Sequence, residues 1–294
     1  MSVHTPVLVK EVLEYLNPQA GQKFIDATFG GGGHTQEFLQ RVGTSGQILA
    51  LDADCGAVEK GIKLFSSKNL IIANANFENL KQVAEKYGFL QVDGILADLG
   101  LSSDQLENSG RGFTFQKDEP LDMRFDMGLD VNAANILNSY SQDELKFIFE
   151  NYGEYRFAGQ LAAQVRKTRK QKPFKTTFDL VEAVKQIQPS PGQKKIHPAT
   201  LVFQALRVAV NQELEVLTNF LPQAIDLLAP GGRLAVIAFQ GAEDRIVKVF
   251  FQTNARKENP NLKILTKKPI AATTEEVIVN PRSRSAKLRV VEKI

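Results

Sequence analysis

Short apolar runs and amphipathic stretches alternate through the first third of the chain. The apolar runs are short enough to be buried strands, and they cover residues 23–28, 47–52, 70–74 and 92–98. Between them, apolar residues recur at helical spacing, which predicts helices over residues 34–42, 57–65 and 78–87. This strand–helix alternation predicts an α/β fold with a doubly wound, mostly parallel sheet and helices on both of its faces.

The alternation stops near Asn108 and resumes near Asn211. The residues between them contain polar loops and predicted helices over 141–152, 155–170, 177–187 and 199–210, without a convincing strand. After them we expect a helix (212–228), a Pro230-Gly231-Gly232 turn, a strand (233–240), a helix (243–255) and a closing pair of strands (262–267 and 287–293). We therefore predict a core formed by residues 1–107 and 211–294, interrupted by an all-helical insertion of residues 108–210.

Composition narrows the class of protein. The 294 residues are 43% hydrophobic, which is enough for an ordinary folded core. The single cysteine, Cys55, excludes a disulfide within the chain, and three widely spaced histidines match no zinc-ligand spacing, so we expect no metal site. We find neither a secretory signal nor an apolar run of membrane-spanning length, and we expect a cytoplasmic protein with no membrane partner. The net charge of +3 permits nucleic-acid binding without indicating it.

Four consecutive glycines, residues 30–33, follow the first predicted strand. Such a run is costly in backbone entropy unless the chain must bend sharply or lie close to a ligand. A phosphate-binding P-loop is excluded because the glycines lead into His34 and Thr35 without a lysine. A dinucleotide fingerprint is excluded because Thr35 or Gln36 stands where its third glycine belongs. Asp26 followed by these glycines instead resembles the first motif of Rossmann-like methyltransferases, in which the carboxylate faces the methionine end of S-adenosylmethionine.

Three further side chains follow strand ends. Asp52 ends the second predicted strand, where a carboxylate can accept hydrogen bonds from ribose hydroxyls. Phe77 lies just beyond the third and is placed either to pack on adenine or to fill the core. Asp98 ends the fourth and is the candidate catalytic residue, because a carboxylate there can accept a hydrogen bond from an amine that attacks a methyl group. The sequence equally allows Asp98 to contact the cofactor.

Motifs along nearly the whole chain resemble one family in order. They are His4-Thr5-Pro6, Asp26-Ala27-Thr28-Phe29-Gly30, Asp98-Leu99-Gly100-Leu101-Ser102, Arg111-Gly112-Phe113, Pro120-Leu121-Asp122-Met123-Arg124, Tyr152-Gly153-Glu154-Tyr155-Arg156, His197-Pro198-Ala199-Thr200, Phe203-Gln204-Ala205-Leu206-Arg207 and Asn280-Pro281-Arg282-Ser283-Arg284. Together they resemble the family of ribosomal RNA small-subunit methyltransferase H, the MraW family.

The resemblance implies a function and a set of site residues. It implies a class I S-adenosylmethionine-dependent methyltransferase that methylates the N4 amine of one cytidine in the decoding region of small-subunit ribosomal RNA. It also implies that the helical insertion recognises the substrate. The cofactor positions that it implies are Gly32, Gly33, His34, Asp52, Phe77, Asp98 and Gln105. The expected partner is small-subunit ribosomal RNA or the small ribosomal subunit, bound by a monomer or a homodimer.

The chain departs from the family pattern at two places. Gln240-Gly241 stands where the family usually has His-Ser, and Leu201 stands where it usually has Arg. Two alternatives therefore stay open: a cofactor-binding ribosome-assembly or RNA-binding factor with weakened catalysis, and a methyltransferase that acts on a different amine.

Basic and aromatic residues give candidate RNA contacts. Basic residues cluster at 166–172, 194–195, 267–268 and 282–289, and runs of this kind contact phosphates when they flank a crevice. Aromatic loop residues stack on displaced bases in some proteins and anchor loops in others. The candidates are Phe113, Phe115, Met123, Arg124, Arg207, Arg245, Arg282 and Arg284. Arg207 is placed either to reach RNA or to pair with a neighbouring carboxylate.

Overall fold

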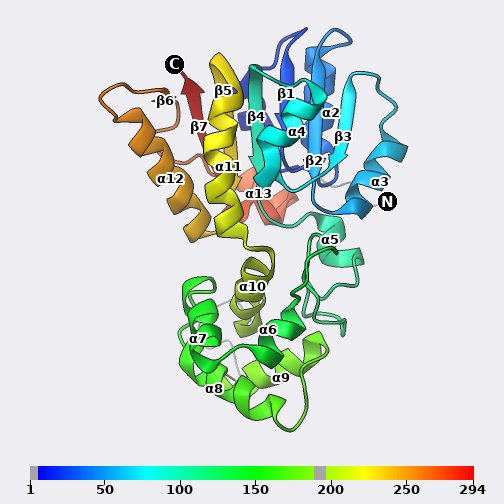
Figure 1. Ribbon diagram of the computed structural model, residues 1–294, viewed down its shortest axis with the longest axis vertical. Coiled ribbons are helices and arrows are strands. Elements are labelled where there is room, and N and C mark those ends of the chain that lie inside the picture. The colour runs from blue at the N-terminus through cyan, green and yellow to red at the C-terminus, as the bar shows by residue number, and fades with distance from the viewer. Residues whose placement is uncertain (1–5, 189–196) are drawn as a thin grey trace. The chain divides into compact units, whose positions relative to one another are not determined.

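The computed structural model describes residues 6–188 and 197–294, and the chain divides into two compact units (Figure 1). Unit 1 comprises Met1–Ser102 and Leu214–Ile294, and unit 2 comprises Ser103–Glu213. The motif residue His4 and the basic pair Lys194-Lys195 lie outside the described residues.

Unit 1 is built on a seven-stranded sheet in the order β3-β2-β1-β4-β5-β7-β6. The strands are β1 (Lys23–Asp26), β2 (Gln47–Asp52), β3 (Leu70–Asn74), β4 (Val92–Asp98), β5 (Leu228–Ala238), β6 (Leu262–Ile264) and β7 (Lys287–Lys293). β7 runs antiparallel to β5 and β6, and the other neighbours are parallel. This is a doubly wound, mostly parallel Rossmann-like sheet, so the predicted α/β fold class is confirmed.

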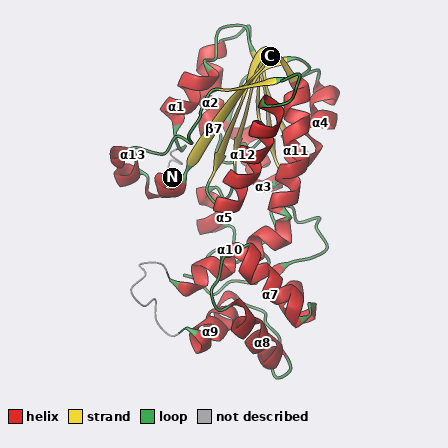
Figure 2. Cartoon of the chain, turned by 90° about the vertical axis from the view of Figure 1, so that its left-hand side faces the viewer, coloured by secondary structure: helices red, strands yellow, loops and turns green. Residues whose placement is uncertain are grey.

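Helices cover both faces of the sheet (Figure 2), because its central strands are apolar on both sides. On one face, Ile25 and Leu49 pack with Phe220 and with other residues of α4 (Leu80–Tyr87), α11 (Glu213–Leu227) and α12 (Gly241–Ala255). Their sequence neighbours Phe24 and Ile48 point to the opposite face, where α1 (Val9–Leu16) and α2 (Gly33–Val42) pack. α3 (Cys55–Leu64) lies beside β2 and β3.

Unit 2 is helical over its described residues. Its helices are α5 (Ser103–Asn108), α6 (Ala133–Ser139), α7 (Gln142–Asn151), α8 (Ala158–Arg169), α9 (Thr177–Ile187) and α10 (Pro198–Asn211). Ser141 and Glu144 form the predicted capping box at the start of α7, where each side chain accepts the other residue's backbone N–H. The extended pairing among these residues is a single antiparallel bridge between Pro120 and Thr176.

Several local predictions were wrong. The Pro230-Gly231-Gly232 turn lies inside β5, because Leu228 already pairs with Val92 of β4 across a register shift. Residues 78–87 do not form one helix, because a 3₁₀ turn, η1 (Phe77–Asn79), precedes α4. The helices that were not predicted are α1, α5, α6 and α13 (Thr274–Val279), together with the 3₁₀ turn η2 (Pro281–Ser285). Most of these elements are too short to show apolar periodicity.

Within the described residues, no helix is long and apolar enough to cross a membrane. The same part of the chain holds no group of three or more His, Cys, Asp or Glu side chains that could ligate a metal ion.

Candidate active site

Acidic side chains end three neighbouring strands of unit 1 at one edge of the sheet. β1 lies between β2 and β4, and its last residue, Asp26, pairs in register with Ala50 and Leu96. Asp52 and Asp98 end β2 and β4. Ligands of open α/β sheets bind in the crevice beyond the carboxyl ends of the strands, so this edge is the candidate site.

Asp26 is a fully buried carboxylate. Thr35 donates its hydroxyl hydrogen to Asp26 Oδ2 at 2.6 Å, and the backbone N–H of Thr28 donates to Oδ1 at 3.3 Å. Burial raises the pKa of Asp26 to about 6, against the opposing effects of the His34 charge and these two hydrogen bonds. The carboxylate therefore sits in surroundings that supply less stabilisation for its charge than water does.

Asp98 is fixed at its backbone, while one of its carboxylate oxygens lacks a partner. Its backbone N–H donates to Thr28 Oγ1 at 2.7 Å. Asp98 Oδ2 lies 3.6 Å from Nε2 of the buried His34, which is beyond hydrogen-bond distance. Asp98 Oδ1 and both ring nitrogens of His34 are buried without a hydrogen-bond partner among the described residues. Unpaired buried polar atoms are costly, and they are found where a ligand or substrate completes the bonding.

Asp52 holds the glycine turn. Its carboxylate accepts the backbone N–H of Gly30 at 2.8 Å through Oδ2 and that of Asp54 at 2.9 Å through Oδ1. Asp52 therefore fixes the backbone on both sides of the crevice edge, at Gly30 and at Asp54.

The glycines serve packing as well as backbone geometry. Gly32 has a φ of +75°, and a Cβ there would lie 2.7 Å from the ring of Phe65. A Cβ on Gly33 would lie 2.8 Å from Pro6. Side chains at these positions are therefore excluded by neighbouring residues of the protein, a reason that the sequence did not indicate beside a sharp bend or a close ligand. The turn places the N-terminus of α2, which has no side-chain cap, at the edge of the sheet.

The departure at Gln240-Gly241 falls at the N-terminus of α12. Glu243 accepts the backbone N–H groups of Phe239 and Gln240 at 2.9 and 3.0 Å, so the helix remains capped. Gln240 and Gly241 are therefore compatible with a normally capped start of α12.

A family model matches residues 1–294, and its description is the MraW methylase family. The chain belongs to the MraW methylase family. It is therefore a methyltransferase, and its methyl donor is S-adenosylmethionine.

Curated relatives of this MraW methylase are similar over their full length. A protein named ribosomal RNA small subunit methyltransferase H from Thermomicrobium roseum is 46% identical, over 100% of this chain and 94% of the relative. A protein of the same name from Carboxydothermus hydrogenoformans is 42% identical, over 99% of this chain and 98% of the relative. A solved structure described as a putative rRNA-methylase from Clostridium thermocellum is 12% identical, with a TM-score of 0.45, over 97% of this chain and 93% of that one.

The described residues of this MraW methylase fit its cofactor. S-adenosylmethionine carries a charged amino-acid end, a ribose and an adenine, and it needs polar groups that the protein does not already use. The unpaired ring nitrogens of the buried His34 are polar groups of this kind. Phe77, just beyond β3, is half-buried and meets Phe220 edge to face at 5.1 Å between ring centroids. Gln105 belongs to unit 2, where it is the buried residue of α5.

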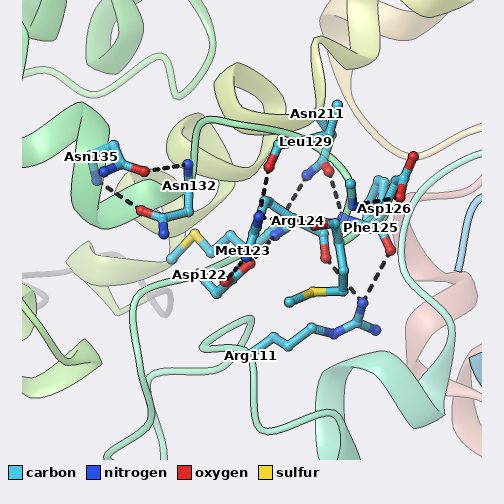
Figure 3. Close-up of polar contacts among 12 residues, drawn as sticks. Arg111, Asp122, Met123, Arg124, Phe125, Asp126, Leu129, Asn132, Asn135 and Asn211 are labelled. Atoms are coloured by element: carbon cyan, nitrogen blue, oxygen red, sulfur yellow. Dashed lines mark hydrogen bonds and ion pairs between the residues drawn. The ribbon is translucent and has the colours of Figure 1, made fainter.

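Three predicted RNA contacts of unit 2 are held by contacts within that unit, and Figure 3 shows two of them, Met123 and Arg124. Arg124 pairs with Asp122 at 2.8 Å and donates to the carbonyl of Leu129 at 2.6 Å. Phe113 is buried and stacks on Phe125 at 5.6 Å, and Met123 is fully buried with a φ of +63°. In this conformation these side chains hold the loop together. They therefore anchor a loop, which is the other role that the sequence allowed for its aromatic residues.

The same loop is fixed by Asn211, the last residue of α10 (Figure 3). Its side-chain amide donates to the carbonyl of Met123 at 2.8 Å and accepts the backbone N–H of Phe125 at 2.7 Å. Arg111 donates to the carbonyls of Arg124 and Phe125 at 3.1 Å each. The loop that follows Pro120 is therefore pre-formed.

Arg207 pairs with a neighbouring carboxylate. Its Nε and Nη2 donate to the two oxygens of Glu213 at 2.7 and 2.9 Å, and both side chains are largely buried. Of the two roles that the sequence left open, the structure shows the ion pair.

The C-terminal basic run is only partly available to a ligand. Arg289 is buried and pairs with Asp244, which Lys287 also contacts at 3.5 Å, and these cations lower the pKa of Asp244. Arg245 and Arg284 are exposed, and Arg282 is half-buried. Exposed cations thus remain at two of the three predicted positions in this region.

Thr28 and Thr35 are site residues that the sequence did not indicate. The Thr28 hydroxyl accepts the backbone N–H of Asp98, and the Thr35 hydroxyl donates to the Asp26 carboxylate. Thr28 lies within the Asp26-to-His34 motif and Thr35 directly follows it, so both are close in sequence to the end of β1.

Proposed function

We propose that this protein methylates the N4 amine of a cytidine in the decoding region of small-subunit ribosomal RNA. The relatives that match the chain from end to end carry the name ribosomal RNA small subunit methyltransferase H, which supports this substrate. The observation that carries the chemistry is Asp98 Oδ1, a buried carboxylate oxygen without a hydrogen-bond partner among the described residues.

Asp98 is proposed as the catalytic residue. The lone pair of a cytosine N4 amine is delocalised into the ring, which makes the amine a weak nucleophile. A carboxylate that accepts its N–H hydrogen bond localises the lone pair and stabilises the positive charge that develops on nitrogen. Because Thr28 fixes the backbone of Asp98, the carboxylate is positioned before the substrate binds.

The cofactor residues proposed here are Asp26, Gly32, Gly33, His34, Asp52, Phe77, Asp98 and Gln105. S-adenosylmethionine supplies a methyl group that is already activated by its sulfonium. Asp26 and the N-terminus of α2 are suited to the amino-acid end, Asp52 to the ribose hydroxyls and Phe77 to the adenine ring. The described chain thus offers a group for each chemical part of the cofactor.

The insertion, residues 108–210, is proposed as the substrate-recognition domain, acting on RNA or the small subunit in the cytoplasm. The exposed basic residues Arg166, Lys167 and Lys170 of α8 and its C-cap support phosphate contacts. Arg245 and Arg284 are proposed phosphate contacts of unit 1. Arg282 is a weaker candidate because it is half-buried, and Phe113, Arg124 and Arg207 are proposed to act by holding unit 2 in shape.

The test is a tritium-transfer assay with the purified protein and labelled S-adenosylmethionine. Small ribosomal subunits, their RNA, duplex DNA and ribosomal proteins are compared as methyl acceptors. The proposal expects label in small-subunit RNA alone, with loss of that label in Asp98→Ala. Label in DNA or protein would show a different amine substrate. Cofactor binding by calorimetry without any product would favour an assembly factor, the alternative that Gln240-Gly241 raises.

A further inference from the structure

Unit 2 contains a pocket. It has a volume of about 350 Å³, within the usual range for ligand-binding pockets. Its lining residues come from the loop that precedes Pro120, from α9 and from the start of α10, and they are Phe115, Phe178, Val181, Glu182, Lys185 and His197. All of them belong to unit 2, so the pocket is described within one compact unit.

One side of the pocket is a fixed aromatic surface. The rings of Phe115 and His197 stack at 4.9 Å between centroids with 22° between their planes, and Phe203 meets Phe115 edge-on at 5.5 Å. His197 Nδ1 accepts the backbone N–H of Ala199 at 3.2 Å, so the neutral imidazole carries its hydrogen on Nε2. This side therefore combines a flat π surface with a hydrogen-bond donor.

The other side is one face of α9. Phe178, Val181, Glu182 and Lys185 are spaced three and four residues apart, which places them on a single helical face. Phe178 is 49% exposed, and its ring makes no aromatic contact with another described residue. Glu182 and Lys185 are also exposed, and neither forms an ion pair within the described part of the chain. An aromatic ring, a carboxylate and an ammonium are thus available to a ligand.

Hydrogen bonds of Thr177 join the two sides of the pocket. The Thr177 hydroxyl donates to the carbonyl of Lys117 at 2.6 Å and accepts the backbone N–H of Glu119 at 3.1 Å, while the Thr177 backbone N–H donates to the carbonyl of Glu119 at 2.9 Å. The loop that carries Phe115 is therefore fixed to the N-terminus of α9. A pre-formed pocket binds its ligand without the cost of ordering the walls.

These groups match the parts of a nucleotide. Sequence-specific proteins bind unpaired RNA bases by stacking them on aromatic side chains and by hydrogen bonding to their edges. Lys185 can pair with a phosphate, and Glu182 can accept a hydrogen bond from the exocyclic amine of a base. We propose that this pocket binds one unpaired nucleotide of the RNA substrate.

The inference rests on the proposed RNA substrate, and Phe178→Ala tests it. Phe147→Ala is the matched control, because Phe147 is a similarly exposed phenylalanine (53%) on α7 of the same unit, outside the pocket. Steady-state methylation of small-subunit RNA is measured with the full-length protein. Phe178→Ala is expected to raise KM for RNA roughly tenfold, the effect of losing one base stack, with kcat and cofactor affinity unchanged. Phe178→Tyr is expected to restore the wild-type KM.

The same variants separate the two proposals. If the wild-type protein methylates small-subunit RNA but Phe178→Ala has the KM of Phe147→Ala, the pocket proposal is overturned while the proposed function stands. If the wild-type protein does not methylate this RNA, the proposed function itself fails. A photo-cross-linking phenylalanine analogue at position 178 gives a second measurement on assembled small subunits. Cross-links to RNA are expected, and cross-links only to ribosomal proteins would overturn the proposal.

Discussion

At the scale of single residues, the site depends on how two carboxylates are held. Thr35 bonds Asp26 and Thr28 bonds Asp98, and Thr28 also donates its backbone N–H to Asp26. Thr28 therefore connects the proposed cofactor carboxylate with the proposed catalytic one. Its contribution is to position Asp98, because it bonds the backbone of that residue and leaves the carboxylate available.

Thr28→Val tests this positioning role. Valine has nearly the same shape but cannot accept the N–H of Asp98, which leaves a partly buried donor without a partner. We expect kcat to fall by roughly tenfold, from a loss of about 1.4 kcal/mol, while KM for S-adenosylmethionine changes little. Thr28→Ser keeps the hydroxyl and should restore kcat. Equal losses in the valine and serine variants would show that the hydroxyl is not the determinant.

The protonation of Asp26 gives a prediction on pH. Burial raises its pKa to about 6 in the folded protein, from about 3.9 in an unfolded chain. The folded protein therefore binds the proton more tightly than the unfolded chain does. The free energy of unfolding of the protein consequently falls as pH rises through the interval from about 4 to about 6. The loss is on the order of 3 kcal/mol for a shift of this size.

Asp26→Asn removes this titration. In urea unfolding without cofactor, the variant should gain stability relative to the wild type between pH 4 and pH 6, and the difference should level off above pH 7. A difference between the two proteins that does not change with pH would contradict the buried, uncompensated carboxylate.

At the scale of elements, the sequence predicted the regular parts of unit 1 well. The second, third and fourth strands match because each is a short apolar run ending in a polar residue. It failed at the Pro230-Gly231-Gly232 turn, because pairing between Leu228 and Val92 extends β5 through residues of low strand propensity. Long-range pairing of this kind leaves no local signal.

The residues of the candidate site also divide into those that the local sequence indicates and those that it does not. Asp52 and Asp98 were predicted from their places at strand ends, which gather at one edge of a parallel sheet, and Asp26 from its place before the glycine run. Gln105 came only from the family motif, since nothing in its local sequence indicates a ligand. The arginines at 124 and 207 looked available for RNA because a sequence does not show which carboxylate or carbonyl a cation will meet after folding.

Asn211→Leu tests how the loop of unit 2 is held. The substitution removes an acceptor from the Phe125 N–H and a donor from the Met123 carbonyl. We expect the free energy of unfolding to fall by about 1–3 kcal/mol for each partner that is left unpaired. Faster amide exchange at Phe125, measured by NMR, should accompany the loss. Unchanged exchange at this amide would show that Asn211 does not hold the loop.

At the scale of the whole molecule, we propose that the cofactor binds mainly to unit 1 and that unit 2 recognises RNA. The two ligands should respond differently to salt, because RNA binding releases counterions from the phosphates. Neutralising Arg166, Lys167 and Lys170 to Gln should weaken RNA binding and reduce the slope of log K against log salt by roughly two to three. Cofactor affinity, measured by calorimetry, should not change. An unchanged RNA slope would remove this basic surface of α8 from the interface.

Nucleoside mass spectrometry of small-subunit ribosomal RNA tests the central claim most directly. The RNA is isolated from cells that contain the protein, from cells that lack it, and from cells that contain only Asp98→Ala. We expect N4-methylated cytidine in the first RNA and its loss from the other two, with the variant folded and present at the normal level. The same amount of N4-methylated cytidine in all three RNAs would contradict the proposal that this protein forms it through Asp98.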